Sequence, residues 1–214
     1  MGPCAFDLTH YRELLEAAKT GGYEWASFDR HPRPGYLYLR HDVDLSLEAA
    51  LEMARIEHEL GVRATYFLMT ESGFYNLDSH VGHYAQRQLR NWGHAIGLHA
   101  VYPRAELDGR FDPVVAWHNP EPEYMSQPIV GAVNVMEEPF FTKGLYRSDS
   151  NHAWREGCPH EELAAGAFEW LQLLIHPEIW VYEGATMRES METMLETKRA
   201  EWLEMLAEDR IDLL

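Results

Sequence analysis

Residues 36–44 read YLYLRHDVD, and this stretch decides the fold. Its first four side chains are apolar or aromatic and predict a buried strand at 36–39, after which come two carboxylates, Asp42 and Asp44. Side chains two residues apart in extended backbone point to the same side. Two like charges there repel each other unless they share a cation, and a divalent metal ion removes that repulsion. The stretch therefore predicts a site at the end of a strand. The alternative is that the two acids cap a helix that begins after Ser46.

The rest of the chain alternates short apolar runs with helix-like stretches, which is typical of an α/β protein with a largely parallel sheet. We expect further strands at 23–28, 64–69, 95–99, 114–117 and 170–175, and weaker ones at 129–135 and 146–148. We expect helices from the cap Thr9 to Gly21, from the cap Ser46 to 60, at 83–92 and, at the end of the chain, at about 185–208. A broken loop is expected between His99 and Trp117. No repeat or long linker divides the chain, so we expect one domain over residues 1–214.

Composition narrows the classes of function that this chain can have. The 214 residues are 46% hydrophobic and 25% charged, an ordinary globular balance, and 18 Lys+Arg against 35 Asp+Glu give a net charge of −17. Such a chain is a poor partner for nucleic acid or anionic lipid. No transmembrane segment or signal peptide is visible, which predicts a cytoplasmic protein. Its two cysteines, Cys4 and Cys158, are too few for a disulfide framework. The oligomeric state stays open.

Three histidines join the two carboxylates at the ends of predicted strands. They are His99, His118 and His176. The carboxyl ends of parallel strands form the edge where α/β proteins build their sites. Each histidine alone is more often structural, but one aspartate with two or three histidines is the ligand set of a catalytic zinc or similar ion. The remaining histidines that we considered, expected at the surface or in caps, are His10, His58, His80, His83, His94 and His160.

Five stretches, correctly ordered along residues 10–182, resemble the polysaccharide deacetylase (NodB-homology) superfamily. More closely, they are similar to a divergent branch with a His-Asp-Val-Asp motif. The stretches are 40–44 (RHDVD), 93–99 (GHAIGLH), 117–120 (WHNP), 148–150 (SDS) and 174–177 (LIHP). The resemblance implies a distorted, incomplete (β/α) barrel that removes acetyl groups from N-acetylated sugars with the help of a metal ion.

The resemblance also implies roles for single residues. Asp42 would be the catalytic base and Asp44 a metal ligand, with an inserted residue between them that the family lacks. His99 would be the second ligand. The family's next histidine, four residues later, is here Pro103, which cannot bind metal. We infer that His118 completes the set, with His41, His94 or His176 as substitutes.

The last motif implies that His176 is the general acid that protonates the leaving amine. Asp149 is expected to orient His176 or the metal side of the site. For substrate contacts we expect Arg40, Arg155 and an aromatic platform. The platform would comprise Trp154, Trp180 and Tyr182, although core packing is the commoner role of such side chains.

Three functions stay open. The first is a metal-dependent deacetylase acting on an N- or O-acetylated carbohydrate. The second is a metal-dependent hydrolase of a small amide or ester, and the third is a non-catalytic sugar- or partner-binding relative. The cofactor would be one divalent ion, with zinc the first expectation and cobalt, nickel or manganese the alternatives. A cytoplasmic location favours an acetylated sugar precursor over finished wall polymer.

Overall fold

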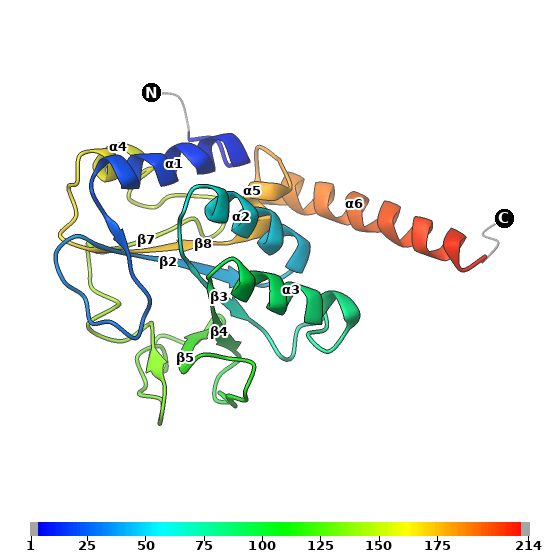
Figure 1. Cartoon of the computed structure of the whole chain (residues 1–214), viewed down its shortest axis with the longest axis horizontal. Helices are drawn as coiled ribbons and strands as arrows, with labels where there is room; N and C mark the ends of the chain where they lie inside the picture. The colour runs from blue at the N-terminus through cyan, green and yellow to red at the C-terminus, as the bar shows by residue number, and fades with distance from the viewer. Residues whose placement is uncertain (1–3, 211–214) are drawn as a thin grey trace.

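A curled, open sheet of parallel strands runs through the computed structural model, which describes residues 4–210 (Figure 1). Its strands are β1 (Glu24–Trp25), β2 (Tyr36–Val43), β3 (Thr65–Leu68), β4 (Ala95–Ala100), β5 (Val114–Trp117), β6 (Val133–Asn134), β7 (Tyr146–Ser148) and β8 (Leu171–Ile175). Their order is β6-β5-β4-β3-β2-β8-β7, and β1 pairs with the start of β2. Every pairing between the described strands is parallel. The predicted α/β class with a parallel sheet is therefore confirmed, and the curled sheet is compatible with an incomplete barrel.

Helices cover one face of this sheet (Figure 1). They are α1 (Leu8–Thr20), α2 (Leu47–Glu59), α3 (His80–Asn91), α4 (His160–Ala164), α5 (Pro177–Val181) and α6 (Met187–Glu208). The last of them, α6, extends away from the sheet, and its first half contacts the rest of the chain, as far as the ion pair of Lys198 with Glu48 (Figure 1). None of the helices among residues 4–210 is both long enough and apolar enough to cross a membrane.

Three helix starts show how the local sequence sets the boundaries. The Ser46 hydroxyl accepts a hydrogen bond from the backbone N–H of Ala49 at 3.1 Å and caps α2 as predicted. The prediction of Thr9 as the cap of α1 was wrong. Asp7 takes that place, because its carboxylate accepts a hydrogen bond from the N–H of His10 at 2.7 Å. Helix α3 begins three residues earlier than predicted, after the cap Ser79.

β2 is longer than the predicted strand at 36–39. Residues Arg40–Val43 pair with β3, so the backbone stays extended through the polar part of the motif. Asp42 and His99 consequently lie within strands, not just past them, whereas Asp44, His118 and His176 each follow a strand directly. The loop predicted between His99 and Trp117 is present over residues 101–113.

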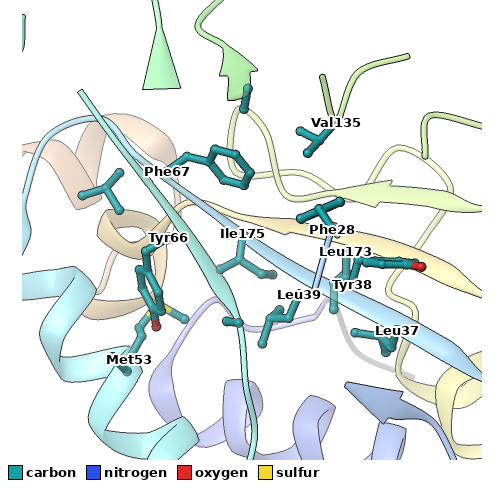
Figure 2. Packing of buried hydrophobic residues seen from close by; sticks show 14 of the residues in the cluster. Phe28, Leu37, Tyr38, Leu39, Met53, Tyr66, Phe67, Val135, Leu173 and Ile175 are labelled. Atoms are coloured by element: carbon teal, nitrogen blue, oxygen red, sulfur yellow. The ribbon is translucent and has the colours of Figure 1, made fainter. Parts of the chain in front are cut away.

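Strand alternation gives the sheet two different faces. Figure 2 shows Tyr66 and Phe67, neighbours in β3, on opposite sides of the sheet. Tyr66 lies on the helix side with Met53 of α2, and Phe67 lies on the other side with Phe28 and Tyr38. The rings of Phe28 and Tyr38 stack with centroids 5.1 Å apart, and Phe28 meets Phe67 edge-on at 5.9 Å. An aromatic layer therefore packs the face opposite the helices.

The register places Asp42, Asp44 and His99 on that second face. Strand pairing puts Phe67 of β3 beside Gly97 of β4, so the side chain two residues further along β4, His99, also points away from the helices. Gly97 is needed here, because a Cβ atom would lie 2.5 Å from the Phe67 ring. The same alternation puts Asp42 and Asp44 on this face and His41 on the helix face.

A buried polar network occupies the helix face. The Glu57 carboxylate of α2 accepts hydrogen bonds from the hydroxyls of Tyr66, at 2.8 Å, and Tyr11, and it lies 2.6 Å from Nε2 of His41. His94, which we predicted at the surface, is buried beside this network. Its Nδ1 accepts from a backbone N–H and its Nε2 lies 3.2 Å from a carbonyl oxygen. Burial lowers the pKa of His94, so it is a neutral structural histidine. His41 and His94 are thereby removed as substitute metal ligands.

Candidate metal centre

Asp44, His99 and His118 meet at the carboxyl edge of the sheet, on the face opposite the helices. Asp44 follows β2, His99 is the fifth residue of β4, and His118 follows β5. Neighbouring strands β4 and β5 pair His99 with Ala116, which brings His118 beside His99. These residues come from three separate segments of sequence, and the curl of the sheet brings them together.

The distances fit a tetrahedral ion. Nε2 of His99 lies 3.0 Å from Oδ1 of Asp44, Nδ1 of His118 lies 3.2 Å from the same oxygen, and the two nitrogens are 3.2 Å apart. Metal–ligand bonds of about 2.0 Å in tetrahedral geometry place two ligand atoms about 3.3 Å apart. The Asp44 Oδ1 atom is also buried without a hydrogen-bond partner among the described residues. This group could therefore hold a metal ion.

Surrounding groups orient the ligands. Nδ1 of His99 lies 3.0 Å from the carbonyl oxygen of Ala116, to which it donates, so Nε2 is left free to bind a metal. Nε2 of His118 lies 3.3 Å from the side-chain amide of Asn119, which accommodates either tautomer of the ring by a half-turn of the amide. The side chain of His99 is 2% exposed and that of His118 is 29% exposed, so the group opens to solvent on the His118 side.

The charges of the group keep the Asp44 carboxylate in the ionised form that binds a metal. Burial disfavours an ionised Asp44, but its contacts with His118 and His99 outweigh burial and lower the pKa of the carboxyl. The same contact with Asp44 raises the pKa of His118. A divalent cation placed among these atoms would compete with a proton for the ring nitrogen of His118, because a metal ligand must be deprotonated.

Asp42 is bound by Arg40 from the same strand. Nε and Nη2 of Arg40 donate to the two carboxylate oxygens at 2.7 and 2.6 Å, and Nη1 donates to Gln172 at 3.3 Å. Burial raises the pKa of Asp42, and the Arg40 charge, followed by that of His99, lowers it further than burial raises it. The prediction that Arg40 contacts substrate was wrong, because the side chain is 1% exposed and its donors are occupied by protein groups.

Asp149 and His176 form a second pair near the same edge. Oδ1 of Asp149 lies 2.6 Å from Nδ1 of His176, and Oδ2 accepts from the His176 backbone N–H at 2.9 Å and from Nε1 of Trp180 at 2.7 Å. Burial lowers the pKa of His176, but the buried Asp149 charge outweighs this and raises it to about 10. Asp149 therefore fixes both the orientation and the protonated state of His176. Its position agrees with the orienting role that we expected.

Glu178 was not among the predicted site residues. It lies in the first turn of α5, is 1% exposed, and has an Oε2 atom without a hydrogen-bond partner among the described residues. Burial raises its pKa to about 8, although the charge of His176 opposes the rise. The only sequence signal was Pro177 after the β8 strand, since proline followed by glutamate is typical of a helix start.

The predicted aromatic platform does not form. Trp180 and Tyr182 are buried, and Trp180 packs against Phe6 with ring centroids 5.1 Å apart. These side chains belong to the core, so the prediction that they contact a sugar was wrong. Trp154 is half-buried, with its ring centroid 6.1 Å from that of Phe6, and Arg155 is exposed.

The cavity beside the centre is small. A space of about 90 Å³ is lined by His99, Leu98 and the loop residues Thr70 and Glu71. The two larger cavities, of about 590 and 770 Å³, lie elsewhere: one around Trp25, the other around Cys158. The space beside His99 is far below the several hundred Å³ that a typical ligand pocket has.

No family model, curated protein or solved structure matches this chain. The resemblance to NodB-type deacetylases therefore rests on the five motifs, and the centre is interpreted from its own geometry.

Proposed function

We propose that this chain is a zinc-dependent hydrolase of the NodB type that removes acetyl groups from an acetylated carbohydrate. The observation that carries the proposal is the Asp44–His99–His118 group. It lies near two further ionisable pairs, Arg40 with Asp42 and Asp149 with His176. Oδ2 of Asp42 lies 3.8 Å from Nε2 of His99, and the charge of His176 acts on both Asp42 and Asp44. Amide hydrolysis requires a metal-binding group, a base and an acid. The three ligands, the carboxylate of Asp42 and the imidazolium of His176 supply them at the carboxyl edge of the sheet.

Asp44, His99 and His118 would hold the ion. When bound, the ion supplies a Lewis acid and lowers the pKa of a water molecule toward about 7. Asp42 would accept the proton of that water, and the ion pair with Arg40 keeps Asp42 ionised, the form that a base needs.

His176 would donate a proton to the nitrogen of the leaving amine. Its raised pKa of about 10 keeps it protonated at neutral pH, so His176 already carries the proton that it would donate when the substrate binds. Asp149 is a positioning residue, because it acts through His176 and is itself fully buried.

The space of about 90 Å³ beside His99 is too small for a sugar ring. A carbohydrate would therefore approach the centre from the open side next to His118. The net charge of −17 disfavours a strongly anionic polymer.

Release of acetate tests the proposal. The zinc-loaded full chain is incubated with N-acetylated sugar monomers, nucleotide-linked N-acetyl sugars, N-acetylated oligosaccharides and O-acetylated sugars, and acetate is measured. We expect release from at least one member, loss of release in His118→Ala, and retention in His83→Ala, which changes an exposed histidine of α3. A zinc-loaded chain that releases acetate from none of them contradicts the proposal.

The small cavity also favours a second candidate, a hydrolase of a small amide or ester without a sugar. The same panel extended with short N-acylated amines and esters separates the two. Turnover of the short substrates alone would assign the second function.

A further inference from the structure

The two cysteines of the chain meet a histidine outside the centre described above. Cys4 precedes α1, His10 lies in the first turn of α1, and Cys158 precedes α4. Helices α1 and α4 lie side by side (Figure 1), which brings the two thiols and the ring together. One ligand atom from each of the three lies within 4.8 Å of the others.

Their geometry fits a thiophilic ion. Nε2 of His10 lies 3.3 Å from Sγ of Cys158. Bonds of about 2.3 Å to sulfur and about 2.0 Å to nitrogen in a tetrahedral zinc site place those two atoms about 3.5 Å apart. The observed separation therefore needs only a small adjustment to admit the ion.

Glu13 prepares the imidazole for this role. Its Oε2 lies 2.8 Å from Nδ1 of His10, and Nε2 lies 3.3 Å from Sγ of Cys158. In the neutral ring that binds a metal, Glu13 would hold the proton on Nδ1 and leave the lone pair of Nε2 toward Cys158. A carboxylate behind a histidine is the usual outer support of a metal-binding imidazole, because it fixes the tautomer and raises the basicity of the ring.

The group is also accessible. Cys4 and Cys158 are both half-buried, and together with His10 they line a cavity of about 770 Å³ that also contacts Trp154 and His160. An ion could enter from this cavity and keep a fourth coordination position toward it. Two thiolates would balance the charge of a divalent ion.

We infer that Cys4, His10 and Cys158 form a second metal site that binds a thiophilic divalent ion of the zinc class. The ion would tie the segment before α1 to the loop before α4. Phe6 lies in the first of these segments and packs on Trp180, whose indole donates a hydrogen bond to Asp149. The ion would therefore stabilise the packing around Trp180 and Asp149, the residue that orients His176. This site does not depend on the proposed deacetylase activity.

Cobalt spectroscopy tests the site and separates it from the centre at Asp44. The full-length chain carrying His118→Ala is stripped of metal, kept reduced and titrated with Co²⁺. A site with thiolates gives sulfur-to-cobalt charge-transfer bands in the near ultraviolet, which the oxygen and nitrogen ligands of the other centre cannot give. We expect these bands to saturate at one cobalt per chain, and Zn²⁺ to displace the cobalt.

Matched variants identify the ligands. Cys158→Ser and, separately, Cys4→Ser should abolish the bands or weaken cobalt binding by more than about 10-fold, since even outer-shell changes cost 10–100-fold. His160→Ala changes a neighbour in the same cavity and should keep them. Far-ultraviolet circular dichroism of each variant shows whether the chain folds, and Cys4→Ser alters a position outside any helix or strand.

Absence of the bands in the folded, reduced chain overturns the inference, as does full retention of them in both cysteine variants. A Cys4–Cys158 disulfide that forms in air, with no cobalt uptake after its reduction, also overturns it. Charge-transfer bands in the His118→Ala chain, together with no acetate release from the zinc-loaded unaltered chain, support this site and contradict only the proposed function.

Discussion

Arg40 and Asp42 lie two residues apart on β2 and form an ion pair with two hydrogen bonds, of 2.7 and 2.6 Å. Both side chains are almost fully buried, so neither charge can be satisfied by water. The pair explains why two charged residues are tolerated inside a central strand. It also keeps Asp42 immobile and ionised next to His99, which is 3.8 Å away.

Arg40→Gln should therefore destabilise the fold. It leaves the Asp42 carboxylate buried without its partner, and removing one member of a buried ion pair costs about 3–5 kcal/mol. Urea denaturation measures the loss. Arg63→Gln, at an exposed arginine, is the control and should change the unfolding free energy by less than about 0.5 kcal/mol. Equal stability of Arg40→Gln and the unaltered chain would show that the pair contributes little.

His118→Ala should lose one of three ligands and so weaken metal binding at Asp44 by more than about 10-fold. The measurement is zinc content after dialysis, made in a Cys158→Ser background so that the cysteine site does not contribute. His83→Ala in the same background is the control. Unchanged zinc in His118→Ala would remove His118 from the ligand set.

Asp42→Asn should keep the metal and lose turnover by on the order of 10²–10⁴-fold, because an amide cannot accept the proton of the attacking water. Zinc content and the rate of acetate release are measured on the same preparation. Arg40 loses its charged partner in this variant, so the assay is run well below its melting temperature. Near-normal turnover would reject Asp42 as the base.

His176→Ala should slow the cleavage of an amide far more than that of an activated aryl ester. An amine leaves only when protonated, whereas a phenolate leaves without an acid. The two rates are compared for the variant and for the unaltered chain. If both substrates slow by similar factors and the melting temperature falls, His176 is a structural residue and not the acid.

The pKa of His176 also predicts how stability depends on pH. Its folded pKa of about 10 exceeds the unfolded value of about 6.5, so between these values the folded chain binds the proton that the unfolded chain has lost. Stability from this proton is complete below pH 6.5 and disappears as the pH rises through 10.

Unfolding free energies of the unaltered chain and of His176→Gln should thus differ most at pH 6 and converge by pH 10. The change in their difference is on the order of a few kcal/mol. His83→Gln should follow the unaltered chain at every pH. A difference that stays constant between pH 6 and pH 10 would show that the proton on His176 adds no stability.

The sequence determined the strands and the candidate ligands. The apolar runs predicted most of the parallel sheet, because a strand covered on both faces needs side chains of this kind along its whole length. Ligand chemistry and the position of each residue at a strand end then singled out Asp44, His99 and His118, which the structure brings within 3.2 Å of one another. Local pattern was sufficient here because each residue's face and place in its strand follow from its own segment.

Only the tertiary structure decided which charged and aromatic groups are free to act. Arg40 and Trp180 carry the residue types of a substrate site, yet neighbours far along the chain bury both of them, and Asp149 binds Trp180 from thirty-one positions away. Burial depends on how helices and strands pack across the sheet, and a sequence window does not contain that information. The meeting of Cys4 with Cys158 is invisible in the sequence for the same reason, because the packing of α1 against α4 creates it.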